Sequence, residues 1–176
     1  MSSVTAPALE PARWQVNDEG EIFSLLYGDV YASRHVAWSQ AQSVFVDGCD
    51  MPSRWVSSRC VRVLETGFGL GINFLMTWAS HKASASSARL QYVAIENHPF
   101  TAQDLSAVLK ISLANLPASL APLGHELADR LIAQWPPLIS GFHSLPLDDQ
   151  TTLTLVFGDV DKALDSLHGR FDAYYL

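Results

Sequence analysis

Basic residues are scarce in this sequence. Lys and Arg total 11 of its 176 residues against 18 Asp and Glu, which gives a formal net charge of −7. Proteins that bind nucleic acids normally neutralise phosphates with a basic face. The shortage therefore argues against a free-standing nucleic-acid binder, unless a basic surface is local or comes from another segment.

Long apolar runs and clustered metal ligands are also lacking. No stretch approaches the roughly 20 apolar residues that a membrane span requires. The small, polar N-terminus, Met1–Pro11, has no signal-peptide pattern, so we expect a loose tail there. Cys49 and Cys60 form no Cys-x-x-Cys pair, and the six histidines show no ligand spacing. We therefore expect a cytoplasmic protein with reduced thiols, no metal and no membrane segment.

Strand and helix patterns alternate from about residue 59 onward. The expected strands are Val61–Glu65, Leu90–Glu96, Phe142–Leu147, Thr151–Phe157 and Phe171–Leu176. The expected helices are Ile72–Ser80, one that begins at Thr101, Gly124–Trp135 and Val160–Leu167. Such alternation is typical of an α/β fold, in which a mainly parallel sheet carries helices on both faces.

The first third of the chain has weaker patterns. Weak strand signals occur at Arg13–Val16 and Ile22–Tyr27, and Val36–Val46 fits either a helix or an extended segment. A short helical turn is expected at Pro52–Trp55. We expect residues 1–58 to be an N-terminal extension that packs on a core of residues 59–176.

The strongest functional signal is Glu65-Thr66-Gly67-Phe68-Gly69-Leu70-Gly71, between an expected strand and an expected helix. Glycines at alternate positions allow a sharp turn and a close approach to a ligand. Their spacing differs from the Gly-x-Gly-x-x-Gly of dinucleotide-binding loops. The preceding acid would repel phosphates but suits the positively charged amine of S-adenosylmethionine. We expect this cofactor, with Glu65 near its amine; a turn that only connects two elements is the alternative.

Two more acids follow neighbouring strands. Glu96 ends the second strand of the regular region, where a carboxylate can accept hydrogen bonds from both ribose hydroxyls. Asp159, in Gly158-Asp159-Val160, either faces the adenine or caps a helix. Acids at three successive strand ends together predict a pocket for a nucleoside.

These segments resemble the methyltransferase domain of the bacterial bifunctional tRNA 5-methylaminomethyl-2-thiouridine biosynthesis protein and its stand-alone relatives. The most specific motif is Glu65-Thr66-Gly67-Phe68-Gly69-x-Gly71-x-Asn73-Phe74-Leu75. Further matching segments are Asp29-Val30-Tyr31, Glu96-Asn97-His98-Pro99, Gly158-Asp159-Val160 and Asp172-Ala173. The resemblance covers most of the chain.

The resemblance implies a Rossmann-like fold and a reaction. Members of this family transfer a methyl group from S-adenosylmethionine to the aminomethyl nitrogen of 5-aminomethyl-2-thiouridine, at the wobble position of tRNA. In longer relatives an FAD-dependent oxidoreductase domain follows, and that domain and its FAD are not expected here. Tyr31 and Asp172 would border the cofactor pocket, and we assign no catalytic residue. The residues implied to line the methionyl part are Gly67, Phe68, Gly69, Gly71 and Asn73.

The sequence departs from the family at three places. Ser39 and Ala41 stand near an expected acidic pair, and Asn97 stands where lysine is common. The family's Asp-Gly-Phe loop, which carries the acid nearest the reacting amine, would begin after Leu176. We therefore expect a truncated, poorly stable fold that is incomplete at its C-terminus, with a strand edge that another segment or a partner would complete. The alternative functions are an inactive remnant or cofactor-binding module and, because of the acidic charge, a small-amine methyltransferase.

Overall fold

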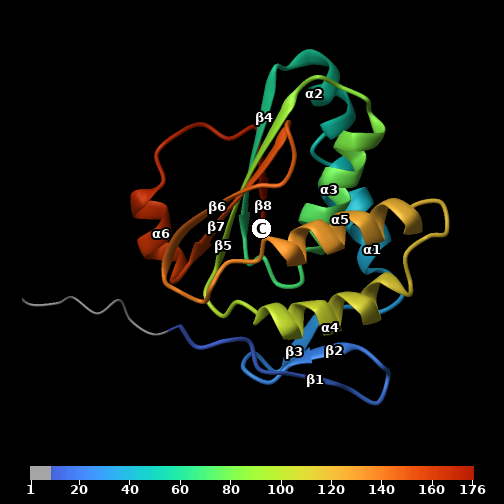
Figure 1. Cartoon of the computed structure of the whole chain (residues 1–176), viewed down its shortest axis with the longest axis vertical. Helices are drawn as coiled ribbons and strands as arrows, with labels where there is room; N and C mark the ends of the chain where they lie inside the picture. The colour runs from blue at the N-terminus through green and yellow to red at the C-terminus, as the bar shows by residue number, and fades with distance from the viewer. Residues whose placement is uncertain (1–8) are drawn as a thin grey trace, which may run out of the picture.

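A five-stranded sheet forms the centre of the computed structural model, which describes residues 9–176 (Figure 1). Most of the expected tail, Met1–Pro11, lies outside these residues. The strand order is β6-β7-β5-β4-β8, and every pairing is parallel except that of β6 with β7. The strands are β4 (Cys60–Thr66), β5 (Arg89–Glu96), β6 (Gly141–Pro146), β7 (Thr151–Phe157) and β8 (Ala173–Tyr175). The expected α/β fold with a mainly parallel sheet is confirmed.

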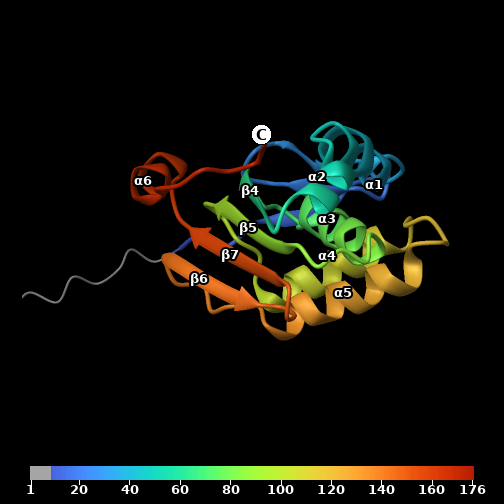
Figure 2. The same ribbon diagram turned by 90° about the horizontal axis from the view of Figure 1, so that it is seen from above.

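Helices lie on both faces of this sheet, but unequally (Figures 1 and 2). One face carries α3 (Ile72–Ala83), α4 (Ala102–Leu113) and α5 (Ala121–Ala133), which share the larger apolar core. The other face carries α6 (Val160–Ser166), where Ala163 packs in a smaller cluster with side chains of β4, β5 and β7. The sequence pattern predicted that α5 begins at Gly124. The helix begins earlier, at Ala121, because a proline in the first turn suits a helix start.

The first third of the chain forms a second, antiparallel sheet and three short helical segments. The sheet is made of β1 (Trp14–Val16), β2 (Ile22–Ser24) and β3 (Asp29–Ala32). The expected strand Ile22–Tyr27 is too long, and β3 was not expected. The chain turns after Ser24, where Gly28, at a φ of +67°, donates its N–H to the Ser24 carbonyl at 3.0 Å. The helical segments are α1 (Ala37–Gln40), the π-helix η1 (Ala41–Asp47) and α2 (Met51–Ser57).

Three contacts dock this first third beside the carboxyl ends of the central strands. The Ala12 N–H donates to the Pro99 carbonyl at 3.1 Å, in the loop that follows β5. The Trp38 indole N–H donates to the carbonyl of Ser112, in α4, at 3.1 Å. The Tyr31 ring lies 5.0 Å from the Phe100 ring, centre to centre. As a result, β3 and η1 lie next to the loop between β4 and α3.

The order of the central strands sets the position of that loop. β4 lies between β5 and β8, with Val63 opposite Ala173 and Glu65 opposite Tyr175. The carboxyl ends of β4, β5 and β7 therefore meet at one edge of the sheet, where ligands of open α/β sheets bind. In the described part of the chain, no helix has the length and apolar character needed to span a membrane.

Candidate functional site

The glycine-rich loop leaves β4 and enters α3 through three positive φ angles. They are +85° at Gly67, +53° at Gly69 and +74° at Gly71, a region that other residues adopt at a cost. A Cβ at Gly71 would lie 2.6 Å from the Phe68 ring, whereas a Cβ at Gly67 would meet no atom within 4 Å. The loop is thus packed against the core at Gly71 and faces open space at Gly67.

Glu96 joins this loop to the end of β5. Its Oε2 accepts a hydrogen bond from the Gly69 N–H at 2.9 Å, and its Oε1 accepts one from the His98 N–H at 2.8 Å. A carboxylate has about four acceptor positions, so both oxygens can take further donors such as hydroxyl groups. The structure therefore brings together Gly69 and Glu96, which lie 27 positions apart in the sequence.

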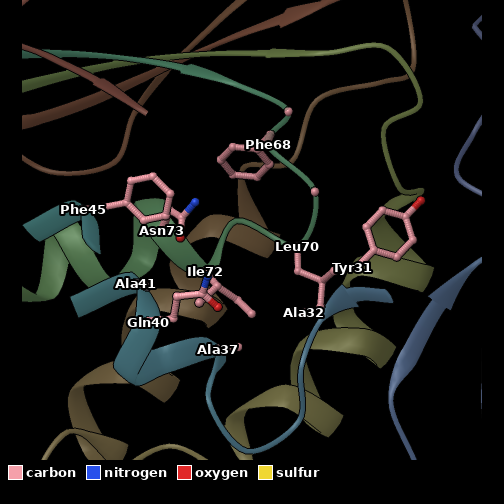
Figure 3. A pocket seen from close by; sticks show the side chains of 12 residues that line it. Tyr31, Ala32, Ala37, Gln40, Ala41, Phe45, Phe68, Leu70, Ile72 and Asn73 are labelled. Atoms are coloured by element: carbon pink, nitrogen blue, oxygen red, sulfur yellow. The ribbon is translucent and has the colours of Figure 1, made fainter. Parts of the chain in front are cut away.

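Three hollows meet at Gly67. The first, of about 190 Å³, lies between the loop and the α1–η1 segment, and Asn73 lines it (Figure 3). The second lies between the loop and β3, and Glu96 borders it. The third lies between the ends of β5 and β7, with Glu96 and Asp159 in its wall. Tyr31 borders the first two, so the hollows follow one another around the loop.

Glu65 lies behind the loop and lines none of these three hollows. It is 2% exposed, its Oε1 accepts from Asn73 Nδ2 at 2.9 Å, and its Oε2 accepts from the Tyr92 hydroxyl at 2.9 Å. Burial raises the pKa of Glu65 to about 8, although both hydrogen bonds oppose this rise. Its carboxyl group therefore holds a proton more tightly than an exposed carboxyl group does. Asn73, which reaches the first hollow, stands between Glu65 and that space.

The two acids predicted from later strand ends have different surroundings. Asp159 caps α6, because its Oδ1 accepts from the Lys162 N–H at 3.2 Å, and it also borders the third hollow. Asp172 accepts from the Arg62 N–H at 2.7 Å, where β8 begins beside β4. It borders none of the three hollows. The structure thus brings Asp159 to the loop and Glu96 but leaves Asp172 away from them.

The two predicted aromatic residues face different surroundings. Phe68 is 3% exposed, and its ring lies 5.7 Å from that of Trp135, so its side chain supports the loop from the core. Tyr31 has a buried hydroxyl without a hydrogen-bond partner among the described residues. Burial raises the pKa of Tyr31. The nearby Ser24 hydroxyl opposes this rise, although it forms no hydrogen bond of good geometry with the Tyr31 hydroxyl. Such a hydroxyl beside a hollow is available to a ligand.

Several residues of the site were not predicted from the sequence. They come from the first third of the chain, and no motif or spacing there marks them as ligand contacts. The docking of the first third of the chain against the loop places them at the hollows. These residues are Ser24, Tyr27, Gln40 and Phe45. Among residues 9–176, no three His, Cys, Asp or Glu side chains gather as a metal site would require.

Comparison with known proteins relates the last third of the chain to methyltransferases and nearly the whole chain to a bifunctional tRNA biosynthesis protein. A family model described as S-adenosyl-L-methionine-dependent methyltransferase matches residues 122–176. The chain is 45% identical over 170 residues to the tRNA 5-methylaminomethyl-2-thiouridine biosynthesis bifunctional protein MnmC of Paraburkholderia phymatum. It is 42% identical over 170 residues to the protein of the same name from Burkholderia multivorans.

These alignments cover 96% of this chain and 25% of each relative, so the chain spans about a quarter of the length of the curated relatives it matches. They include the glycine-rich loop, which lies outside the family-model match. Among solved structures, the crystal structure of MNMC2 from Aquifex aeolicus has the same fold. Its TM-score is 0.62 at 17% identity, over 96% of this chain and 50% of that chain. The resemblance identified from the motifs is confirmed.

Proposed function

Because the chain belongs to the family of MnmC-like methyltransferase domains, we propose that its glycine-rich loop binds S-adenosylmethionine. The proposed reaction is methyl transfer to the aminomethyl nitrogen of 5-aminomethyl-2-thiouridine in tRNA. The observation that carries the proposal is the 2.9 Å hydrogen bond from Gly69 to Glu96. This hydrogen bond places the open face of the loop beside Glu96, the carboxylate that would bind the ribose.

The residues around the loop fit the cofactor part by part. The third hollow would hold the adenine beside Asp159, and Glu96 would accept hydrogen bonds from the ribose hydroxyls. The open space at Gly67 would allow the chain of the ligand to pass close to the backbone. The methionyl part would then enter the first hollow, between Tyr31 and Asn73. The carboxylates of Glu96 and Asp159, which border the other hollows, disfavour a phosphate beside the loop.

The contribution of the chain to the reaction is positioning. When bound, S-adenosylmethionine supplies an electrophilic methyl group on a sulfonium sulfur. The loop and Glu96 would fix the nucleoside from two sides, which limits the directions in which that methyl group can point. Tyr31, whose hydroxyl has no partner among the described residues, would form the wall of the cofactor site on the side of the N-terminal sheet.

Calorimetric titration with S-adenosylhomocysteine tests the cofactor site. We expect saturable binding by the wild type. Glu96→Gln should weaken binding by about 10- to 100-fold, the range for hydrogen bonds to charged groups. Glu126→Gln, which changes an exposed acid of α5, is the matched control and should bind like the wild type. Absence of saturable heat with the folded wild type would refute the cofactor site.

Transfer of tritiated methyl groups to hypomodified tRNA tests the substrate. A second candidate, a small-amine methyltransferase, is favoured by the net charge of −7 and by the acids at the hollows. The two candidates predict that different substrates are labelled by the same tritiated cofactor. Labelling of tRNA supports the first, and labelling of small amines without labelling of tRNA supports the second.

A further inference from the structure

We propose that Glu65 is a positioning residue that orients the Asn73 amide, so that the amide oxygen, and not a carboxylate, receives the methionyl ammonium group. This inference rests on the proposed cofactor. It assigns recognition of the ammonium group to a neutral side chain, with the buried carboxyl group of Glu65 acting from behind it.

The first support is that the Glu65 side chain does not reach the first hollow itself. Its side chain is 2% exposed, and both of its oxygens are engaged, by Asn73 Nδ2 and by the Tyr92 hydroxyl. The Tyr92 side chain is fully buried, so the Glu65–Tyr92 pair faces the core. Asn73, in the first turn of α3, is the member of this cluster that lines the first hollow (Figure 3).

The second support is the state of the Asn73 amide. Its Nδ2 donates to Glu65, while its Oδ1 has no hydrogen-bond partner among the described residues. This oxygen is not one of the buried unpaired atoms, so it remains accessible. An amide has donors only on nitrogen and accepts only on oxygen. A nitrogen held by Glu65 therefore leaves the acceptor free.

The chemistry of the ligand favours this orientation. An ammonium group has three N–H donors and no acceptor. A reversed Asn73 would turn its own N–H groups toward those donors, whereas the observed orientation offers an oxygen. Glu65 keeps the favourable orientation because it supplies an acceptor on the core side, where an apolar residue would supply none.

Two ligands separate this role from a merely structural one. S-adenosylhomocysteine carries the ammonium group, and 5′-methylthioadenosine has the same nucleoside and thioether without the amino-acid tail. Both should be titrated into the wild type, Glu65→Leu, Asn73→Leu and Glu65→Gln. The glutamine variant is the conservative control, because its amide can accept from Asn73 and donate to Tyr92.

We expect Glu65→Leu and Asn73→Leu to bind S-adenosylhomocysteine about 10- to 100-fold more weakly than the wild type. All four proteins should bind 5′-methylthioadenosine within about threefold of each other, and Glu65→Gln should keep its affinity for both ligands. Three results would each overturn the proposed role of Glu65. They are equal losses of affinity for the two ligands, an unchanged affinity of Asn73→Leu for S-adenosylhomocysteine, and a Glu65→Gln variant that binds S-adenosylhomocysteine as weakly as Glu65→Leu does. A wild type that binds 5′-methylthioadenosine but not S-adenosylhomocysteine also overturns this role, and one that binds neither refutes the proposed function.

Discussion

Replacing Glu65 with glutamine should remove a pH-dependent part of the stability of this chain. Burial raises the pKa of Glu65 from 4.5 to about 8, so the folded chain holds this proton more tightly than the unfolded chain. The resulting contribution to stability is complete below pH 4.5 and is lost as the pH rises through 8. At about 1.36 kcal/mol per pKa unit, the total is about 5 kcal/mol, of which about 4 kcal/mol is lost between pH 5 and 9. This is an upper value, because water that enters around an ionised Glu65 reduces the penalty.

Urea unfolding of three proteins at pH 5 to 9 measures this effect. The difference between the wild type and Glu65→Gln cancels the other titrating groups. The free energy of unfolding of the wild type should fall, relative to that of Glu65→Gln, by up to about 4 kcal/mol over this range. Glu126→Gln changes an exposed acid and should follow the wild type within about 0.5 kcal/mol. Parallel curves for the wild type and Glu65→Gln would show that the folded chain does not retain this proton, and the reasoning would be refuted.

Two further predictions concern the loop and the core. Gly71→Ala should lower the free energy of unfolding by about 1–3 kcal/mol in urea titrations, because its φ is +74° and its Cβ would lie 2.6 Å from the Phe68 ring. Gly28→Ala, with a φ of +67° and no atom within 4 Å, should cost less than Gly71→Ala, and equal costs would contradict the clash. His81 is buried and its pKa is lowered by burial, so the wild type should lose stability as the pH falls below 6.5. His81→Gln should lack this part of the acid dependence in thermal melts at pH 5 and 7; identical shifts in both proteins would count against it.

The strand–loop–helix unit was predictable because its patterns are local. The apolar run from Val61 predicts β4, and the alternating glycines predict a sharp turn. The burial of the Glu65 side chain could also have been predicted from the alternation of residues along β4. Val61, Val63 and Glu65 alternate along one face of the strand, so an acid two residues after a core valine faces the core as well. Its place before the loop favoured a direct ligand contact over burial.

The contribution of the first third of the chain could not be predicted in the same way. β3 has four residues and follows a turn, so its alternation is too short to detect. Nothing in Ala41–Asp47 distinguishes a π-helix from an α-helix, since both place apolar residues on one side. Tyr31 was assigned through a motif, but its contact with Phe100 depends on the docking of the N-terminal sheet against the loop after β5. Contacts of this kind are set by tertiary packing and not by local propensity.

The chemistry at position 65 separates stability from function. A buried carboxyl costs stability as the pH rises, so an apolar residue there would stabilise the fold over the same range. An apolar residue, however, would leave the Asn73 N–H group and the Tyr92 hydroxyl without their acceptor. Glutamine satisfies both and cannot ionise, so Glu65→Gln should keep the orientation of the Asn73 amide and the ligand affinity while it loses the pH dependence of stability. Hydrogen bonding at position 65 therefore serves ligand binding, whereas ionisation of the buried carboxyl group affects only the stability of the fold.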